Sequence, residues 1–369
     1  MAETLGYLGP PGTFSEEAAL RYSREMELCP FDTWPEIFEA VADQRVAEAI
    51  VPLENSCEGS VNLTLNFLAG REDVFIRAEV VLPVVQNLLA LPEATDIDTI
   101  CSHPQALAQC YNYLRQNFPR VIPSPTESTS AAARLAQASP KTAAIGTARA
   151  AGLYGLEVKA AAINDQAANV TRFVVLGREE AARREGGVKT SLVVFIVDRP
   201  GALYRILQEF AVRGLNLTRI ESRPTGNRLG EYHFFIDLIG HREDPAVAEA
   251  LQAVSSQSAR VRLLGSYPAE TVPFTANPAG LEELRRDIDS IDRQIVELLG
   301  RRAALMTAVA RAKEGRPSFR DPGREEEVLN RLREWARREG FDPEVLADVY
   351  RLLFPYFVHL QGLMAEKKP

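Results

Sequence analysis

The sequence predicts three consecutive domains: an α/β domain, a small α+β domain and an all-helical domain. Short apolar strands alternate with helical patterns over the first domain, which is typical of α/β layers. A βαββαβ order follows, as in ferredoxin-like units. Apolar residues then recur at steps of three and four, which predicts helices. The expected boundaries are 1–178, 188–268 and 278–369.

Composition excludes several classes of function. The chain has 369 residues, too many for one ordinary core, and its net charge of -8 argues against nucleic acid or an anionic membrane as a partner. No apolar run approaches the roughly 18–20 residues that a membrane span needs, and no signal peptide is evident. The four cysteines lack metal-ligand spacing, so we expect free thiols in a reducing cytoplasm and neither a metal nor another cofactor.

In the first domain, polar residues follow several predicted strands. Strands are expected at 5–8, 48–53, 99–101 and 142–146, and helices follow the first, third and fourth of these. A further buried strand at 169–177 begins with a hydroxyl, a guanidinium and an aromatic ring. Such groups at the mouth of a strand form sites in α/β sheets, although a strand edge that faces water is the alternative.

The second domain contains no cluster of acids and bases. A charged, glycine-containing linker over 179–189 precedes it. Strands are expected at 190–197, 217–223, 231–239 and 261–266, with helices at 202–213 and 245–255. The first strand–helix turn, at 201–203, could present backbone N–H groups to a carboxylate, or it could be an ordinary tight turn.

The third domain follows a linker at 268–278 and is predicted to be helical. A helix over 281–313 would be roughly 50 Å long at ~1.5 Å per residue. One small domain cannot bury such a helix alone, so a second copy of the chain is expected. Arg302 and Lys313 lie about three turns apart and share a face. Shorter helices are expected at 323–339 and 343–367.

Ordered motifs connect all three domains to known families. The first domain contains YLGPPGTFS (7–15), VPLENS (51–56), SHPQ (102–105), TESTS (126–130) and TRF (171–173). It resembles prephenate dehydratases over its whole length. Through GAL (201–203) and ESRP (221–224), the second domain resembles the ACT regulatory domain attached to such enzymes. The third is similar to all-helical chorismate mutases through Arg285, Arg302, Lys313, Arg324, Glu325 and Gln361.

The resemblance implies a fold and a pathway. The first domain would have a two-lobed fold like that of periplasmic binding proteins. The chain would act in phenylalanine biosynthesis in the cytoplasm, as a homodimer or higher homo-oligomer. Chorismate would become prephenate in the third domain, and prephenate would become phenylpyruvate, CO2 and water in the first. Phenylalanine would be the allosteric inhibitor. The order, with the mutase last, differs from the better-known fusion.

The resemblance also implies roles in the dehydratase site. Thr171 would donate a hydrogen bond to the departing hydroxyl. Arg172 would anchor the side-chain carboxylate of the substrate or brace the cleft, and Phe173 would pack against the ring or the core. The residues expected to line a cleft between the lobes are Asn55, Ser56, Ser102, His103, Ser128, Thr129 and Asn169.

In the mutase site, Arg285 from a partner chain and Arg302 would hold carboxylates. Lys313 and Gln361 would donate to the ether oxygen of chorismate, because charge develops there as the bond breaks. Arg324 and Glu325 would orient the substrate. The effector-binding residues implied in the ACT domain are Gly201, Ala202, Leu203, Asn216, Glu221, Ser222 and Arg223.

Two departures from the mutase pattern leave an alternative open. The family usually has a serine four residues before the glutamine, where this chain has Phe357. Pro355 lies inside the same predicted helix, where it removes a backbone hydrogen bond. Both favour a dehydratase whose helical domain only dimerises, whereas the basic residues and Gln361 favour an active mutase. A further alternative is an amino-acid-binding protein without chemistry.

Overall fold

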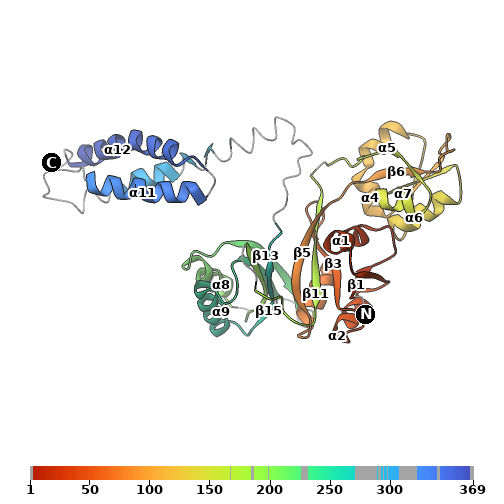
Figure 1. Cartoon of the computed structure of the whole chain (residues 1–369), viewed down its shortest axis with the longest axis horizontal. Helices are drawn as coiled ribbons and strands as arrows, with labels where there is room; N and C mark the ends of the chain where they lie inside the picture. Colours follow the sequence, from red (N-terminus) through yellow and green to blue (C-terminus); the bar gives the residue numbers. More distant parts are fainter. Residues whose placement is uncertain are drawn as a thin grey trace. The chain divides into compact units, whose positions relative to one another are not determined.

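The computed structural model describes residues 3–166, 168–183, 187–197, 199–225, 232–270, most of 289–306, 322–338 and 341–365. These residues form two compact units, 1–275 and 276–369, and each is described by itself. The first unit contains the first two predicted domains in contact with each other (Figure 1). Most of the predicted long helix and of the second linker lies outside the described residues.

The first lobe is a mixed sheet with helices on its faces. Its strand order is β2-β1-β3-β11-β5, with β4 paired to β3. Phe173 and Val175 pack with α1 on one face, whereas Val174 and Leu176 pack with α2 and α3 on the other. The elements are β1 (Thr4–Leu8), α1 (Phe14–Tyr22), β2 (Glu27–Phe31), α2 (Trp34–Ala42), β3 (Glu48–Asn55), β4 (Gly59–Ser60), α3 (Asn62–Gly70), β5 (Phe75–Pro83) and β11 (Val170–Gly177).

The second lobe is a separate five-stranded sheet in the order β10-β6-β9-β7-β8. The chain crosses between the lobes twice, from β5 to β6 and from β10 back to β11, which confirms the predicted two-lobed fold. The elements are β6 (Asn87–Ala90), β7 (Thr99–Ser102), α4 (Pro104–Gln109), α5 (Tyr111–Asn117), β8 (Pro123–Pro125), α6 (Thr129–Gln137), β9 (Thr142–Gly146), α7 (Ala148–Leu153) and β10 (Glu157–Ala160).

The second domain has the predicted βαββαβ order. Its antiparallel sheet runs β13-β14-β12-β15. Figure 1 shows α8 and α9 on the side of this sheet that faces away from the first domain. Ile206 and Phe210 of α8 and Val247 of α9 pack there. The elements are β12 (Val188–Phe195), α8 (Ala202–Ala211), β13 (Leu217–Pro224), β14 (Tyr232–Ile239), α9 (Pro245–Gln257) and β15 (Arg260–Pro268).

The opposite face of this sheet is buried against the first domain. Phe235 and Tyr267 belong to the same apolar cluster as Leu68 and Ile76 of the first lobe. Gly265 has a φ of +148°, and a Cβ at this position would collide with the Ile76 carbonyl. Only glycine therefore allows β15 to approach β5 so closely. The two domains share one core, a relationship that the sequence patterns did not predict.

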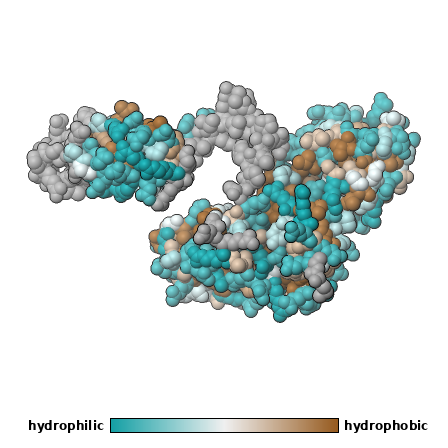
Figure 2. Space-filling model, viewed as in Figure 1, coloured by the Kyte–Doolittle hydropathy of each residue, from teal (hydrophilic) through white to brown (hydrophobic). Residues whose placement is uncertain are grey.

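The helical unit contains α11 (Pro322–Arg338) and α12 (Pro343–Ala365), close to the predicted bounds, and residues 298–306 are also helical. Leu329, Ala347 and Phe354 form its small core. Helix α12 continues past Pro355. Figure 2 shows apolar residues on the surface of this unit. Among the described helices, none has the length and apolar character needed to cross a membrane.

Candidate active site

A cleft of about 350 Å³ lies between the two lobes of the first domain. Both lobes and the crossover between them contribute side chains to it. The first lobe supplies Thr13, Phe14, Ser15, Trp34, Pro52, Asn55, Val61, Thr171 and Phe173. The second lobe supplies His103, Gln105, Ala106, Gln109, Glu127, Ser128 and Thr129, and the crossover supplies Val84 and Gln86.

A hydrogen bond between neighbouring strands orients the Thr171 hydroxyl. Antiparallel pairing of β11 with β3 places Thr171 opposite Asn55. Asn55 Nδ2 donates to Thr171 Oγ1 (2.9 Å) and to Asn169 Oδ1 (2.7 Å). Asn55 Oδ1 accepts from the backbone N–H of Cys57 (2.9 Å), which fixes the orientation of the amide. Because Thr171 Oγ1 accepts this bond, its own proton can be donated to a ligand in the cleft.

Thr171 and Phe173 both face the cleft, because residues two apart in a strand point to the same side. Arg172 is paired with Glu54, but Phe173 is paired with Pro52, so the register shifts between them. The extra residue is Leu53 of β3, so the bulge bends β3, the strand that carries Pro52 and Asn55. The cleft wall thus combines a polar donor with an aromatic surface.

Two helix N-termini point their first turns at the cleft. Thr13 precedes α1, and Ser128 caps α6 by accepting from the Ala131 N–H over 3.0 Å. Both residues line the cleft, as do Ser15 and Thr129. Helix N-termini carry partial positive charge and bind anions. No lysine or arginine is among the described lining residues, so an anionic ligand would be held by these termini, hydroxyls and amides.

An interlobe clasp holds α1 against the second lobe. The clasp comprises Gly12, Glu16, Thr147 and Arg149. Glu16 accepts from the Gly12 N–H (2.7 Å) and pairs with Arg149 of α7 (2.7 Å), while Thr147 Oγ1 donates to the Gly12 carbonyl (3.0 Å). Burial opposes ionisation of Glu16, but the hydrogen bonds from Arg149 and Gly12 outweigh burial and hold its pKa below the ordinary value. The clasp fixes the first turn of α1 at the cleft.

Comparison with known proteins matches each of the three domains to a family model. The prephenate dehydratase family model matches residues 5–181, the ACT domain model residues 190–256 and the chorismate mutase type II model residues 284–362. The prephenate dehydratase of Lactococcus lactis subsp. lactis (strain IL1403) is 40% identical over 269 residues, which cover 71% of this chain and 96% of that protein. The chain belongs to the prephenate dehydratase family.

Two further relatives add detail. The bifunctional chorismate mutase/prephenate dehydratase of Aquifex aeolicus (strain VF5) is 37% identical over 266 residues, covering 72% of this chain and 73% of that protein. The prephenate dehydratase of Arthrobacter aurescens, whose crystal structure was solved in complex with L-Phe, has a sequence 37% identical to this chain. The structural match covers 79% of this chain and 99% of the Arthrobacter chain, with a TM-score of 0.67. The chain is thus an enzyme of phenylalanine biosynthesis with dehydratase and mutase domains, not a binding protein.

Of the predicted dehydratase site, the structure brings Asn55, His103, Ser128, Thr129, Thr171 and Phe173 together in the cleft. Ser56, Ser102 and Asn169 are not among its lining residues. Ser56 Oγ donates to the Ala168 carbonyl (3.2 Å), and buried Ser102 Oγ donates to the Ile145 carbonyl (2.7 Å). Asn169 lines a neighbouring pocket and accepts from Asn55. These three residues form hydrogen bonds next to the cleft and do not line it.

Of the two roles predicted for Arg172, the position of its side chain is compatible with bracing the cleft and not with anchoring the substrate. Arg172 lies on the face of β11 opposite Thr171, only 7% exposed, and its guanidinium contacts carboxylates of both the dehydratase and the ACT domain. It cannot anchor a carboxylate in the cleft, because successive side chains of a strand point to opposite faces.

The sequence reasoning missed several lining residues. Thr13, Phe14, Ser15 and Glu127 lie within motifs that were recognised, so their proximity to the site could have been inferred. Gln109 follows Gln105 by about one helical turn. Trp34 and Gln86 lie outside every recognised motif, and no sequence signal marks them. Trp34 Nε1 donates to Thr64 Oγ1 over 2.9 Å, which holds the indole at the cleft.

The predicted effector residues are divided between two faces of the ACT domain. Gly201 has a φ of +79° and begins α8 without a side chain to cap it, and the Ala202 N–H donates to the Arg199 carbonyl over 3.1 Å. Ser222 is exposed on edge strand β13. Glu221 and Arg223 instead face the dehydratase domain, where Glu221 bonds to Ser60, and Arg223 NH1 donates to Asn62 Oδ1 (2.7 Å). Strand alternation again explains the difference.

In the mutase domain, Arg302 is held among aromatic rings. Its guanidinium carbon lies 4.0 Å from the centroid of Phe357, 5.3 Å from Tyr350 and 6.0 Å from Phe354. Burial lowers its pKa, and its buried NH1 has no hydrogen-bond partner among the described residues. Phe357 therefore forms a platform for the predicted carboxylate-binding arginine.

The remaining mutase predictions are only partly covered by the structure. Arg324 and Glu325 lie in the first turn of α11, where Arg324 pairs with Glu327 over 2.6 Å. Arg285, Lys313 and the side chain of Gln361 lie outside the described residues. Their roles stay predictions from the resemblance.

Proposed function

We propose that prephenate binds in the interlobe cleft and that Thr171 assists the departure of its hydroxyl group. The observation that carries this assignment is the Asn55–Thr171 hydrogen bond, which turns the Thr171 proton toward a ligand. As the ring carboxylate leaves as CO2, its bonding electrons enter the ring and the C–O bond breaks. Hydroxide takes up a proton to become water. A threonine hydroxyl is a weak acid, so Thr171 is a hydrogen-bond donor rather than the proton source.

The charge distribution of the cleft supports this chemistry. A carboxylate that is weakly stabilised in the ground state loses CO2 more readily. The described lining offers no lysine or arginine to stabilise the ring carboxylate. The N-termini of α1 and α6 can hold the carboxylate of the pyruvyl side chain, which must remain bound. Phe173 provides an apolar surface for the ring as it becomes aromatic.

We propose that Arg302 binds a carboxylate of chorismate in the mutase domain. This rearrangement is intramolecular, so the protein must hold the substrate compact and stabilise charge at the ether oxygen. The buried NH1 of Arg302, which has no hydrogen-bond partner in the described part of the chain, and its aromatic surroundings favour an anionic partner. Lys313 and Gln361 are the proposed donors to the ether oxygen. Arg285 of a second chain, Arg324 and Glu325 are proposed to complete the site.

We propose that phenylalanine binds the ACT domain and lowers dehydratase activity. The relative from Arthrobacter aurescens was solved with L-Phe. The N-terminus of α8, at Gly201 to Leu203, can receive the α-carboxylate, and Asn216 and Ser222 can face a second copy of the domain in a homodimer or higher oligomer. A typical allosteric coupling of about 1–3 kcal/mol is reciprocal, so prephenate would weaken phenylalanine binding equally. The free cysteines fit the proposed cytoplasmic location.

The test uses the purified full chain and follows phenylpyruvate formation. Phenylpyruvate should form from prephenate and, through both domains, from chorismate alone, and phenylalanine should lower both rates. Turnover of prephenate without any turnover of chorismate would restrict the helical domain to dimerisation. Absence of turnover with either substrate would reject the whole assignment.

A further inference from the structure

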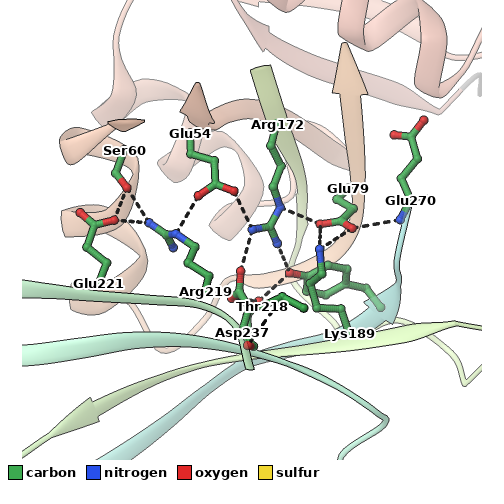
Figure 3. Close-up of polar contacts among 12 residues, drawn as sticks. Glu54, Ser60, Glu79, Arg172, Lys189, Thr218, Arg219, Glu221, Asp237 and Glu270 are labelled. Carbon is green, nitrogen blue, oxygen red and sulfur yellow. Dashed lines mark hydrogen bonds and ion pairs between the residues drawn. The ribbon is translucent and has the colours of Figure 1, made fainter. Parts of the chain in front are cut away.

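Strand β11 carries cleft residues on one face and a contact with the ACT domain on the other. Thr171 and Phe173 line the cleft, and Arg172 between them points toward the ACT sheet. Figure 3 shows its guanidinium between carboxylates that come from both domains. Arg172 Nε donates to Glu79 (2.7 Å) and NH1 to Glu54 (3.3 Å) within the dehydratase domain. NH1 also donates to Asp237 (2.6 Å), and NH2 donates to the Tyr267 hydroxyl (2.9 Å), both in the ACT domain.

These groups, which we call the Arg172 network, are buried together. Arg172 is 7% exposed, Glu79 6% and Asp237 2%. Burial by itself lowers the pKa of Arg172, but Tyr267, Asp237 and Glu79 outweigh burial and raise it. Burial raises the pKa of Asp237, whereas Arg172 and Arg219 outweigh burial and lower it. A buried ion pair that loses one partner leaves an uncompensated charge, so the position of Arg172 depends on the docked ACT domain.

A second connection reaches the neighbouring strand. Glu54 immediately precedes Asn55, the residue that donates to Thr171. The carboxylate of Glu54 is shared between Arg172 (3.3 Å) and Arg219 of the ACT domain (2.8 Å). Arg219 also donates to Ser60 Oγ on β4 over 2.8 Å. The ACT domain therefore contacts both Glu54 and Arg172, which are the chain neighbours of Asn55 and Thr171.

The same contacts could serve only to attach the two domains. Arg262 of the ACT domain allows simple attachment to be distinguished from an effect on the cleft, because it also reaches into the dehydratase domain. Its NH2 donates to the Val74 carbonyl over 3.0 Å, and its NH1 contacts the Leu68 carbonyl. Arg262 is 6% exposed, and among the described residues it forms no hydrogen bond or ion pair with β11 or β3. It therefore provides a matched docking arginine that leaves the two cleft strands untouched.

We propose that Arg172 is the positioning residue through which the ACT domain sets the geometry of Thr171 and Asn55. A shift of the ACT sheet moves Asp237 and Tyr267, and the guanidinium transmits this shift to the β11 backbone. Because displacement of a reacting group by about 1 Å can cost a hundredfold in rate, a small shift is sufficient. The link to phenylalanine rests on the proposed effector function, whereas the link to basal kcat does not.

The test compares Arg172→Lys with Arg262→Lys in the full-length protein. We expect Arg172→Lys to lower the dehydratase kcat about tenfold or more, with KM within about twofold. Calorimetry should show wild-type phenylalanine affinity in this variant, but phenylalanine should no longer change its rate appreciably. Arg262→Lys should lower the Tm while keeping kcat and inhibition near wild type. Mutase activity in each sample reports the amount of active protein.

Several outcomes decide the proposal. Wild-type kcat and inhibition in Arg172→Lys would overturn it, as would an equal loss of kcat in Arg262→Lys. If Arg172→Lys does not fold, Asp237→Asn carries the same test, because it removes the interdomain charge and leaves Arg172 in place. A wild-type protein that fails to bind phenylalanine would reject the effector function, while the kcat comparison would still decide the role of Arg172.

Discussion

The amide of Asn55 donates to the hydroxyl of Thr171 over 2.9 Å, across two antiparallel strands at the floor of the interlobe cleft. This bond determines which way the threonine proton can point.

Replacement of Thr171 by valine keeps the shape of the side chain and removes the hydroxyl. We expect prephenate turnover to fall by roughly a hundredfold, the usual scale for loss of one transition-state donor. Thr171→Ser should retain most of the activity because it keeps the donor. The measurement is kcat for phenylpyruvate formation, with chorismate rearrangement in the same sample as the control. Equal rates in the valine and serine variants would remove Thr171 from the mechanism.

Asn55→Asp should reverse the direction of the central hydrogen bond. An ionised carboxylate only accepts hydrogen bonds, so the Thr171 hydroxyl would donate to Asp and could no longer donate to substrate. We expect a loss of kcat comparable to that of Thr171→Val. In the double variant with Thr171→Val, the two losses should not add, because both remove the same donor. Full additivity would show that the residues act independently.

Glu16→Gln should change the acid side of the stability profile. The folded pKa of Glu16 lies below its ordinary value, because its bonds to Arg149 and Gly12 outweigh burial. Wild-type Glu16 therefore contributes stability above its unfolded-state pKa of about 4.3 and loses it as the pH falls through the lower folded pKa. The difference in Tm between wild type and variant should shrink on acidification below about pH 4. A difference in Tm that stays constant over this pH range would contradict the stabilising role of the Glu16 carboxylate in the clasp.

Gly265→Ala should weaken the attachment of the ACT domain. The added Cβ would collide with the Ile76 carbonyl, and the backbone at Gly265 has a positive φ. We expect a loss of about 2 kcal/mol or more in the free energy of unfolding, as for other strained or overpacked sites. Gly152→Ala is a matched control, because open space surrounds that position in α7. Similar unfolding curves for both variants would contradict the tight approach of β15 to β5.

Phe357→Leu tests the platform beneath Arg302. Leucine keeps an apolar side chain in the buried position but removes the aromatic face, which is worth about 0.5–2 kcal/mol to a cation. We expect chorismate rearrangement to fall severalfold, while prephenate turnover by the same protein stays unchanged. An increase in mutase activity would mean that Phe357 obstructs the site instead of supporting it.

Sequence patterns predicted the order of the domains and the βαββαβ unit, and the family resemblance implied the two lobes and several cleft residues. They could not assign the face of Arg172. Strand β11 is buried on both sides, so its residues show no polar–apolar alternation from which a face can be inferred. The sequence also could not reveal that Glu79, from β5, lies beside Arg172, because that contact depends on sheet order rather than on local pattern. Trp34 and Gln86 reach the cleft only through the tertiary fold.

The shared core also limits how this chain can be divided. The charged segment around 179–187 has the composition of a linker, so the chain could be expected to divide there into two independent domains. Truncation at this point would have a cost. It would expose Leu68 and Ile76 on one side and Phe235 and Tyr267 on the other, all of which are buried in one cluster. Exposed apolar patches of this kind promote association with other molecules. The dehydratase and ACT domains should therefore be expressed, transplanted or exchanged between enzymes as one piece, although they match two separate family models.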